Sequence, residues 1–221
     1  MATFSETRAF FDAIARRYDR AYAPDASLTR ARMAGVIEVL GAPKRVLDLG
    51  VGTGRELSAL QDAGHTVTGV DASAEMLALC NKRARKITAQ VCDFWAPLPF
   101  EGGTFDAVVS LFGSLAHPPD ATALGLLSRE VWRVLSAGGV FVFEVPTPAW
   151  IDSLPPAPAG DEPLSIVRTD RLTARHHDHV ARASIEVATH DEPTWRAALE
   201  GFDVSFDSLD AREVRVIARR G

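Results

Sequence analysis

The sequence has few cysteines, more acidic than basic residues and no long hydrophobic run, and each of these scarcities excludes a class of protein. Cys80 and Cys92 are the only cysteines, and their spacing fits neither a disulfide framework nor a metal site. The formal net charge of -5 has the wrong sign for neutralising a phosphate backbone, so we expect no nucleic-acid partner. The lack of a leader pattern and of about 18 consecutive apolar residues predicts a cytoplasmic protein with no membrane partner.

One basic cluster, Lys82 to Lys86, runs against this acidic balance. It closes a predicted helix, where cationic side chains interact favourably with the carbonyl end of the helix dipole. We therefore interpret the cluster as a helix terminus and not as a nucleic-acid site.

The composition is that of one globular domain, with 47% hydrophobic and 24% charged residues. From residue 44 onward, short apolar runs alternate with amphipathic helical patterns, which predicts an α/β fold with a mostly parallel sheet covered on both faces. The last two predicted strands, 202–209 and 213–218, are too closely joined for a parallel crossover. We expect them to form an antiparallel pair at one end of the sheet.

The segment between the fifth strand and the last helix is the least regular part of the sequence. Prolines recur from Pro146 to Pro163, which predicts an irregular surface connection. The alternation of residues 165–189 then suggests two antiparallel strands that turn near the cluster His176-His177-Asp178-His179. Adjacent strand side chains point to opposite faces and a polar turn is ordinarily solvated, so we expect no bound metal.

The strongest motif is a glycine-rich loop after the first predicted strand. Asp48 ends the strand, and Gly50, Gly52 and Gly54 follow at alternate positions before a helix. Glycines let the backbone turn tightly and approach a ligand, and a carboxylate at this place favours a cationic ligand over a pyrophosphate. The third glycine also comes one position too early for the dinucleotide fingerprint, which argues against a nicotinamide-dependent oxidoreductase.

A second acidic residue, Asp71, ends the next predicted strand. In nucleotide-binding α/β folds, a carboxylate at this place accepts hydrogen bonds from the ribose hydroxyls. The alternative is a helix N-cap shared with Ser73. We favour ribose binding because the glycine loop precedes Asp71.

The loop from Asp48 to Gly54 resembles motif I of the class I S-adenosylmethionine-dependent methyltransferases. The resemblance covers residues 44–145 closely and extends loosely to 11–19, which look like the opening of small-molecule methyltransferases of the ubiquinone-biosynthesis kind (methyltransferase type 11). The other matching segments are residues 91–95, 104–110, 111–120 and 131–139. The resemblance implies a Rossmann-like seven-stranded sheet, S-adenosyl-L-methionine as cofactor and S-adenosyl-L-homocysteine as product.

The same resemblance assigns roles to single residues. Asp93, after the third strand, would accept a hydrogen bond from the adenine amino group, while Phe94 or Trp95 would either cover the ring or pack in the core. The residues expected to bind the cofactor are Tyr18, Asp48, Gly50, Gly52, Gly54, Asp71, Asp93, Phe94 and Ser110. The expected parts of the single domain are an N-terminal helical cap at 1–43, a cofactor-binding core at 44–145, a substrate-lid insertion at 146–192, and a C-terminal helix and strand pair at 193–221.

The expected reaction is in-line displacement, because the methyl group leaves a sulfonium. A small-molecule acceptor is expected from the net charge of -5, from the long segment between strand five and the last helix that could enclose a ligand, and from the lack of an Asn-Pro-Pro-Tyr or Asp-Pro-Pro-Tyr motif of the amino-methylating DNA enzymes after strand four. His117, after that strand, is the candidate catalytic base, with a histidine that only caps the loop before Pro118 as the alternative. A non-catalytic S-adenosylmethionine-binding module is the rival function. The protein is expected to be a monomer or a homodimer.

Overall fold

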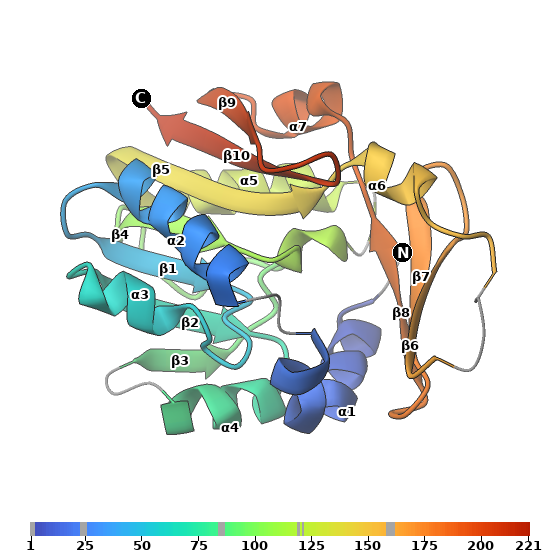
Figure 1. The fold of residues 1–221 in the computed structure, drawn as a ribbon. Helices are drawn as coiled ribbons and strands as arrows, with labels where there is room; N and C mark the ends of the chain where they lie inside the picture. Colours follow the sequence, from blue (N-terminus) through green and yellow to red (C-terminus); the bar gives the residue numbers. More distant parts are fainter. Residues whose placement is uncertain (1–2, 23–25, 84–86, 119, 121, 158–161) are drawn as a thin grey trace.

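The central strands consist of nearly uninterrupted apolar residues, because helices bury both faces of the sheet that they form. The computed structural model contains a seven-stranded sheet in the order β3-β2-β1-β4-β5-β10-β9 and a three-stranded sheet in the order β6-β7-β8 (Figure 1). The residues described are 3–22, 26–83, 87–118, 120, 122–157 and 162–221. The strands of the large sheet are β1 Arg45–Leu49, β2 Thr66–Asp71, β3 Thr88–Val91, β4 Phe105–Ser110, β5 Leu135–Pro146, β9 Phe202–Ser208 and β10 Glu213–Arg220.

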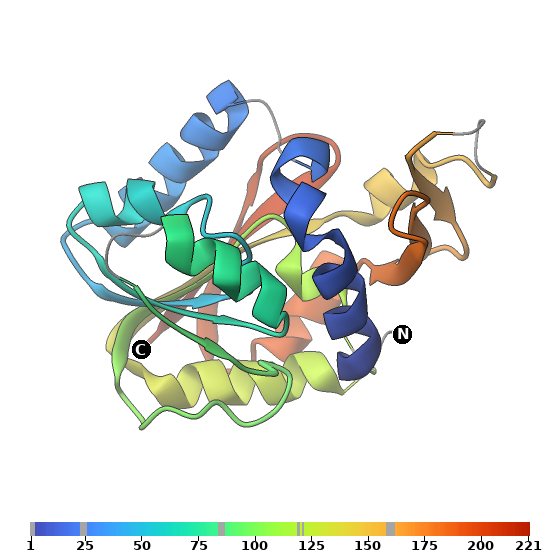
Figure 2. The same cartoon turned by 90° about the horizontal axis from the view of Figure 1, so that it is seen from below.

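The two faces of the large sheet are covered by different helices (Figure 2). Val46 of β1 packs in the cluster beneath α2, α3 and α4, whereas its neighbour Leu47 packs in the cluster beneath α5 and α7. This alternation follows from the twofold period of a strand. The helices are α2 Ala26–Leu40, α3 Leu57–Asp62, α4 Ala74–Arg83, α5 Ala123–Val134 and α7 Glu192–Ala198.

The strand directions confirm the predicted topology. β1 pairs in parallel with β2 and β4, β2 with β3, and β4 with β5, whereas β10 is antiparallel to both β5 and β9. The strand order reverses between β1 and β4, and ligands of open α/β sheets bind at the carboxyl ends of the strands at such a point. The fold therefore directs the search for a site to the ends of β1, β2 and β4.

Helix α1 and the small sheet lie together at this end of the large sheet (Figure 1). Phe10 and Ile14 of α1 pack with Met76 of α4 and Ile185 of β8 in one buried cluster. The elements here are α1 Phe4–Tyr22, a short helix α6 Pro148–Asp152, and the strands β6 Leu164–Arg168, β7 Thr173–Asp178 and β8 Ala183–Ala188.

The prediction of two strands turning near residues 176–179 is wrong, because this segment forms three strands. His176, His177 and Asp178 lie on the middle strand, β7, and the chain turns at 169–172 and 179–182. Asp178 is buried in spite of its charge, because Arg17 and Tyr22 of α1 donate to it, and its Oδ1 also accepts the Ala181 N–H at 2.8 Å. Arg17 and Tyr22 lie about 160 positions away in the sequence. Because the local sequence does not show these partners, the polar cluster at 176–179 looked like a solvated turn.

The connection after β5 is also more regular than predicted. Pro148 begins α6, and the Thr147 side chain accepts the Trp150 N–H at 3.4 Å as its N-cap. The predicted helix end at Arg85 and helix start at Ala121 lie outside the described residues. Within the described chain, each helix is too short or too polar to cross a membrane.

Replacing Asp178 by alanine should lower the free energy of unfolding by about 2–4 kcal/mol, because the change leaves the Arg17 guanidinium without its buried partner. Urea denaturation measures this loss. The matched control is Asp170→Ala in an exposed turn, where we expect a change within about 0.5 kcal/mol. Equal losses in the two variants would mean that the contact between α1 and β7 does not stabilise the fold.

Candidate functional site

The glycine loop leaves the carboxyl end of β1 and bends back beside β2. Gly50, Gly52 and Gly54 have φ angles of +84°, +54° and +72°, and the Gly50 N–H donates to the Val70 carbonyl at 2.8 Å. Such angles favour glycine. A Cβ on Gly54 would lie 2.8 Å from Cys80 Sγ, so this glycine allows the loop to pack closely on α4.

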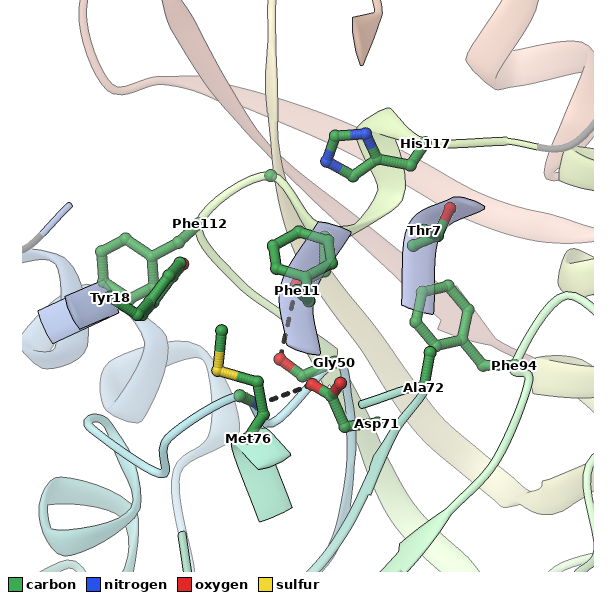
Figure 3. Close-up of a pocket in the computed structure, with 13 residues that line it drawn as sticks. Thr7, Phe11, Tyr18, Gly50, Asp71, Ala72, Met76, Phe94, Phe112 and His117 are labelled. Atoms are coloured by element: carbon green, nitrogen blue, oxygen red, sulfur yellow. Dashed lines mark hydrogen bonds between the residues drawn. The ribbon is translucent and has the colours of Figure 1, made fainter. Parts of the chain in front are cut away.

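Two small cavities lie beside this loop, with volumes of about 70 Å³ and about 30 Å³. We call them the first and the second cavity. Residues shared by their linings are Tyr18, Gly50, Gly52, Phe112 and Ser114, so the two are neighbouring parts of one site. Figure 3 shows Gly50 and Asp71 at one end of the first cavity and His117 at the other.

Asp48 is a buried carboxylate on the wall of the second cavity. It is 4% exposed and makes no hydrogen bond or ion pair with another described residue. Burial raises the pKa of Asp48 well above its usual range, and the nearby carboxylates of Glu56 and Asp71 raise it further. A bound cation would offset these effects, so the charge of the second cavity favours a cationic group, such as the ammonium or sulfonium of S-adenosylmethionine, over a pyrophosphate.

Asp71 lines the first cavity at the end of β2. Its Oδ2 accepts the Gly52 N–H at 2.8 Å and its Oδ1 accepts the Ser73 N–H at 2.9 Å. Burial raises the pKa of Asp71 to about 6. Ser73 Oγ accepts the Met76 N–H at 3.0 Å at the start of α4, so the cap is provided by Ser73 while Asp71 connects the glycine loop to that helix.

Phe94 lines the first cavity, whereas its neighbour Trp95 packs against the main core. Asp93 Oδ1 accepts the Trp95 N–H at 3.0 Å, and Ser110 is fully buried with its hydroxyl donating to the Leu49 carbonyl at 2.8 Å. Neither Asp93 nor Ser110 lines either cavity. Their contacts hold the strand ends in place, and their roles toward the cofactor stay predictions.

Helix α1 covers both cavities through Tyr18. Burial raises the pKa of Tyr18 to about 12, so its hydroxyl is protonated at neutral pH. The Arg55 guanidinium lies 5.6 Å from the Tyr18 ring centroid and 4.9 Å from that of Phe112. α1 is also bonded to the glycine loop, because Asp19 Oδ1 accepts from Thr53 Oγ1 at 2.6 Å.

His117 lies between α1 and the small sheet. Its ring centroid is 5.7 Å from that of Phe11, and its Nδ1 is 2.8 Å from the Glu186 carbonyl oxygen of β8. A carbonyl can only accept, so Nδ1 carries the proton and Nε2 carries the lone pair. Burial lowers the pKa of His117 below 6.5, so the ring is neutral at pH 7 and can accept a proton.

A third cavity, with a volume of about 450 Å³, lies beyond His117. His117, Phe112 and Gly113 line both the first and the third cavity, so the two meet at these residues. The other residues of the third cavity are Leu28, Arg32, Ala116, Pro146, Trp150, Ile166, His176, Val187, Asp210, Arg212 and Glu213. Its walls therefore come from α2, the loop after β4, the end of β5, α6, the small sheet and the turn between β9 and β10.

Three important residues were not predicted as parts of a site. Phe112 borders all three cavities and has a φ of +53°, which is unusual for a bulky residue, but no local pattern marks it. Glu56 follows the glycine loop closely and reaches the second cavity from the start of α3. His176 was assigned to a solvated turn, and it lines the third cavity.

Comparison with known sequences identifies the central part of the chain. Residues 46–139 match the family model described as a methyltransferase domain. The demethylmenaquinone methyltransferase of Thermus thermophilus is 37% identical over 147 residues, which cover 62% of this chain and 65% of that protein. A putative 23S rRNA (guanine-N(1)-)-methyltransferase of Micromonospora griseorubida is 33% identical over 115 residues, covering 51% of this chain and 35% of that protein. The chain thus spans only part of these curated relatives.

Solved structures share the fold over the whole chain. The 1,6-didemethyltoxoflavin-N1-methyltransferase of Burkholderia thailandensis, solved with bound 1,6-didemethyltoxoflavin and S-adenosylhomocysteine, gives a TM-score of 0.65 at 21% identity and covers 100% of this chain and 91% of that one. The domain match and the shared fold confirm the prediction from the sequence. Residues 46–139 match a methyltransferase domain, in line with the resemblance to the class I S-adenosylmethionine-dependent methyltransferases, and the fold is that of a solved methyltransferase.

Replacing Gly50 by alanine should weaken S-adenosylhomocysteine binding by at least about tenfold, a loss of at least about 1.4 kcal/mol. A Cβ at this position would lie 2.5 Å from Ser114 Oγ, so the loop would have to shift. The control is Gly103→Ala, which has a similar φ of +71° but no atom within 4 Å of the new Cβ. Calorimetric titration that gives wild-type affinity for Gly50→Ala would show that the loop does not contact the ligand.

Proposed function

We propose that this protein transfers the methyl group of S-adenosylmethionine to a small molecule in the third cavity, at an acceptor atom that gives up a proton. The observation that carries the proposal is the position of His117. Its neutral ring borders both the first and the third cavity, and the Glu186 carbonyl fixes the tautomer with the lone pair on Nε2.

The residues around the first two cavities are suited to the methionine, ribose and adenine parts of the donor. Asp48 and Glu56 would hold the cationic methionine end, where Asp48 has no partner among the described residues. Asp71 would accept from the ribose hydroxyls, and Phe94 would cover the adenine. Bound S-adenosylmethionine supplies an electrophilic methyl group on a sulfonium.

The protein contributes alignment and one proton transfer. Methyl transfer is an in-line displacement, so fixing the acceptor against the methyl carbon and excluding water supplies much of the rate enhancement. His117 Nε2 takes the acceptor proton as the new bond to the methyl carbon forms and the bond to sulfur breaks. The Glu186 carbonyl then stabilises the imidazolium by accepting from Nδ1–H.

A small-molecule acceptor is favoured over ribosomal RNA by the volume and the charge of the third cavity. The third cavity, about 450 Å³, lies within the roughly 300–1,000 Å³ typical of small-molecule sites. Two arginines and two carboxylates line it, Arg32 and Arg212 against Asp210 and Glu213, whereas an RNA site requires an excess of positive charge.

The test is an assay with S-adenosylmethionine labelled in its methyl group and, as acceptors, a panel of phenols and amines or 23S ribosomal RNA. We expect label in one or more small acceptors and none above background in RNA. Faster labelling of RNA than of any small molecule would overturn the acceptor assignment. Donor binding without turnover across the panel would favour the non-catalytic module instead.

Donor entry should require α1 to move. The first two cavities hold about 70 Å³ and about 30 Å³, well below the roughly 300 Å³ that a small ligand needs. α1 and the small sheet, joined through Asp178, would open and close as a lid over the site.

Hydrogen exchange tests this lid. S-adenosylhomocysteine should increase protection of the amides in α1 and in β7 and β8, and leave the remote β9 unchanged. Exchange in α1 and the small sheet that does not respond to the ligand would contradict the lid.

A further inference from the structure

His176 of β7 lines the third cavity, and the adjacent residue of the strand, His177, does not. Strand alternation turns His177 to the other face, where its ring stacks on His179 at 5.8 Å between centroids. The His176 ring is packed between two aromatic residues of α1, with centroids 5.3 Å from Phe10 and 5.2 Å from Tyr22. These contacts fix the ring at the cavity wall.

The nitrogens of His176 have no hydrogen-bond partner among the described residues. Burial lowers the pKa of His176 to about 4, and the nearby His117 lowers it further, while Asp178 acts in the opposite direction. The ring is therefore neutral at pH 7, with one N–H donor and one acceptor nitrogen. Two neutral imidazoles, His117 and His176, thus border the same cavity.

The rest of the third cavity provides flat apolar walls and balanced charge. The rings of Phe112 and Trp150 line it. The Arg32 guanidinium is paired with the Glu213 carboxylate and is therefore not free to bind an anion. Aromatic side chains favour planar ligands through ring stacking, and the two lining arginines and two lining carboxylates leave no net charge that would select a charged ligand.

Resting on the function proposed above, we propose that His176 is an acceptor-binding residue that forms a second hydrogen bond beside His117, and that the two select a neutral planar ring carrying two polar groups. One group faces His117 and loses its proton during transfer. The second polar group forms a hydrogen bond with His176, and this bond positions the acceptor ring against the methyl group.

The probe for this proposal is catechol, a neutral planar ring with two hydroxyl groups, added to the complete protein in complex with S-adenosylhomocysteine. 1,2-Dimethoxybenzene is the matched probe, because it has the same ring without hydroxyl donors. The readout is the set of histidine Hε1–Cε1 NMR signals, assigned through single substitutions. We expect catechol to shift the signals of His117 and His176 and to leave those of His177 and His179 in place.

Two variants separate binding from folding. His176→Phe keeps the aromatic packing against Phe10 and Tyr22 but removes both nitrogens, and should weaken catechol binding by about tenfold. His177→Asn, on the opposite face of the strand, should leave catechol affinity unchanged. S-adenosylhomocysteine titration of both variants should give wild-type affinity.

Catechol affinity that is unchanged in His176→Phe, catechol shifts that are absent at His176, or dimethoxybenzene binding as tight as catechol would overturn this inference. Failure of the wild-type protein to bind S-adenosylhomocysteine would contradict the proposed function itself. The donor titration therefore distinguishes the two failures.

Discussion

Replacement of His117 by glutamine lowers kcat for methyl transfer by about 10²–10⁴-fold, the contribution expected of a general base. S-adenosylhomocysteine affinity should stay within about twofold of wild type, because in the proposed mechanism His117 acts on the acceptor and not on the donor. Steady-state kinetics with an acceptor identified in the labelling assay, together with calorimetry, measure the two effects. The control is His65→Asn just before β2, where an amide oxygen can still accept the Lys44 N–H that His65 Nδ1 accepts at 3.1 Å. We expect His65→Asn to have wild-type kcat.

The pH dependence of the methyl-transfer rate is a second test of the role of His117. A base works only when it is deprotonated, and burial places the pKa of His117 below 6.5. The rate should therefore be constant just above neutral pH and fall as the pH drops below the pKa of His117. His117→Gln should remove this acid limb. A profile identical in the two proteins would mean that His117 is only a structural residue whose ring packs on Phe11.

Replacement of Asp71 by alanine weakens S-adenosylmethionine binding by about 10–100-fold. Hydrogen bonds to a charged acceptor are worth roughly 1.5–3 kcal/mol, and each 1.4 kcal/mol is a factor of ten. Part of the loss would come from the glycine loop, because Asp71 also accepts the Gly52 N–H. Isothermal titration calorimetry measures the affinity, and thermal unfolding verifies that the variant is folded.

Asp106→Ala is the matched control for Asp71. Asp106 lies near the amino end of β4, which β1 separates from the strand of Asp71, and pairs with Arg45 away from the cavities. Its replacement should leave donor affinity unchanged. Donor affinity that is also unchanged in Asp71→Ala would assign Asp71 a purely structural role, in which it only connects the glycine loop to the start of α4.

The sequence predicted the parts of the structure that depend on local patterns. The buried strands, the glycine loop and the acids Asp48 and Asp71 follow from periodicity and from the conformational requirements of a tight turn, and the structure places the loop and both acids around the first two cavities. The antiparallel pair β9 and β10 followed from a connection too short for a crossover.

The parts that were missed depend on contacts between distant segments. Asp178 is buried because α1, about 160 positions away, supplies Arg17 and Tyr22, and no local pattern shows this. The inward orientation of His176 depends in the same way on the register of β7 within a three-stranded sheet. Side chains of the third cavity come from six separated segments, so the acceptor side of the site could not be predicted from any one of them.

The most direct test of the central claim is a calorimetric titration of the wild-type protein with S-adenosylhomocysteine and, separately, with a nicotinamide dinucleotide. The Asp48 carboxylate has no partner among the described residues. This carboxylate and the spacing of Gly50, Gly52 and Gly54 predict saturable binding of S-adenosylhomocysteine and no binding of the dinucleotide. Binding of the dinucleotide without binding of S-adenosylhomocysteine would contradict the assignment of the site.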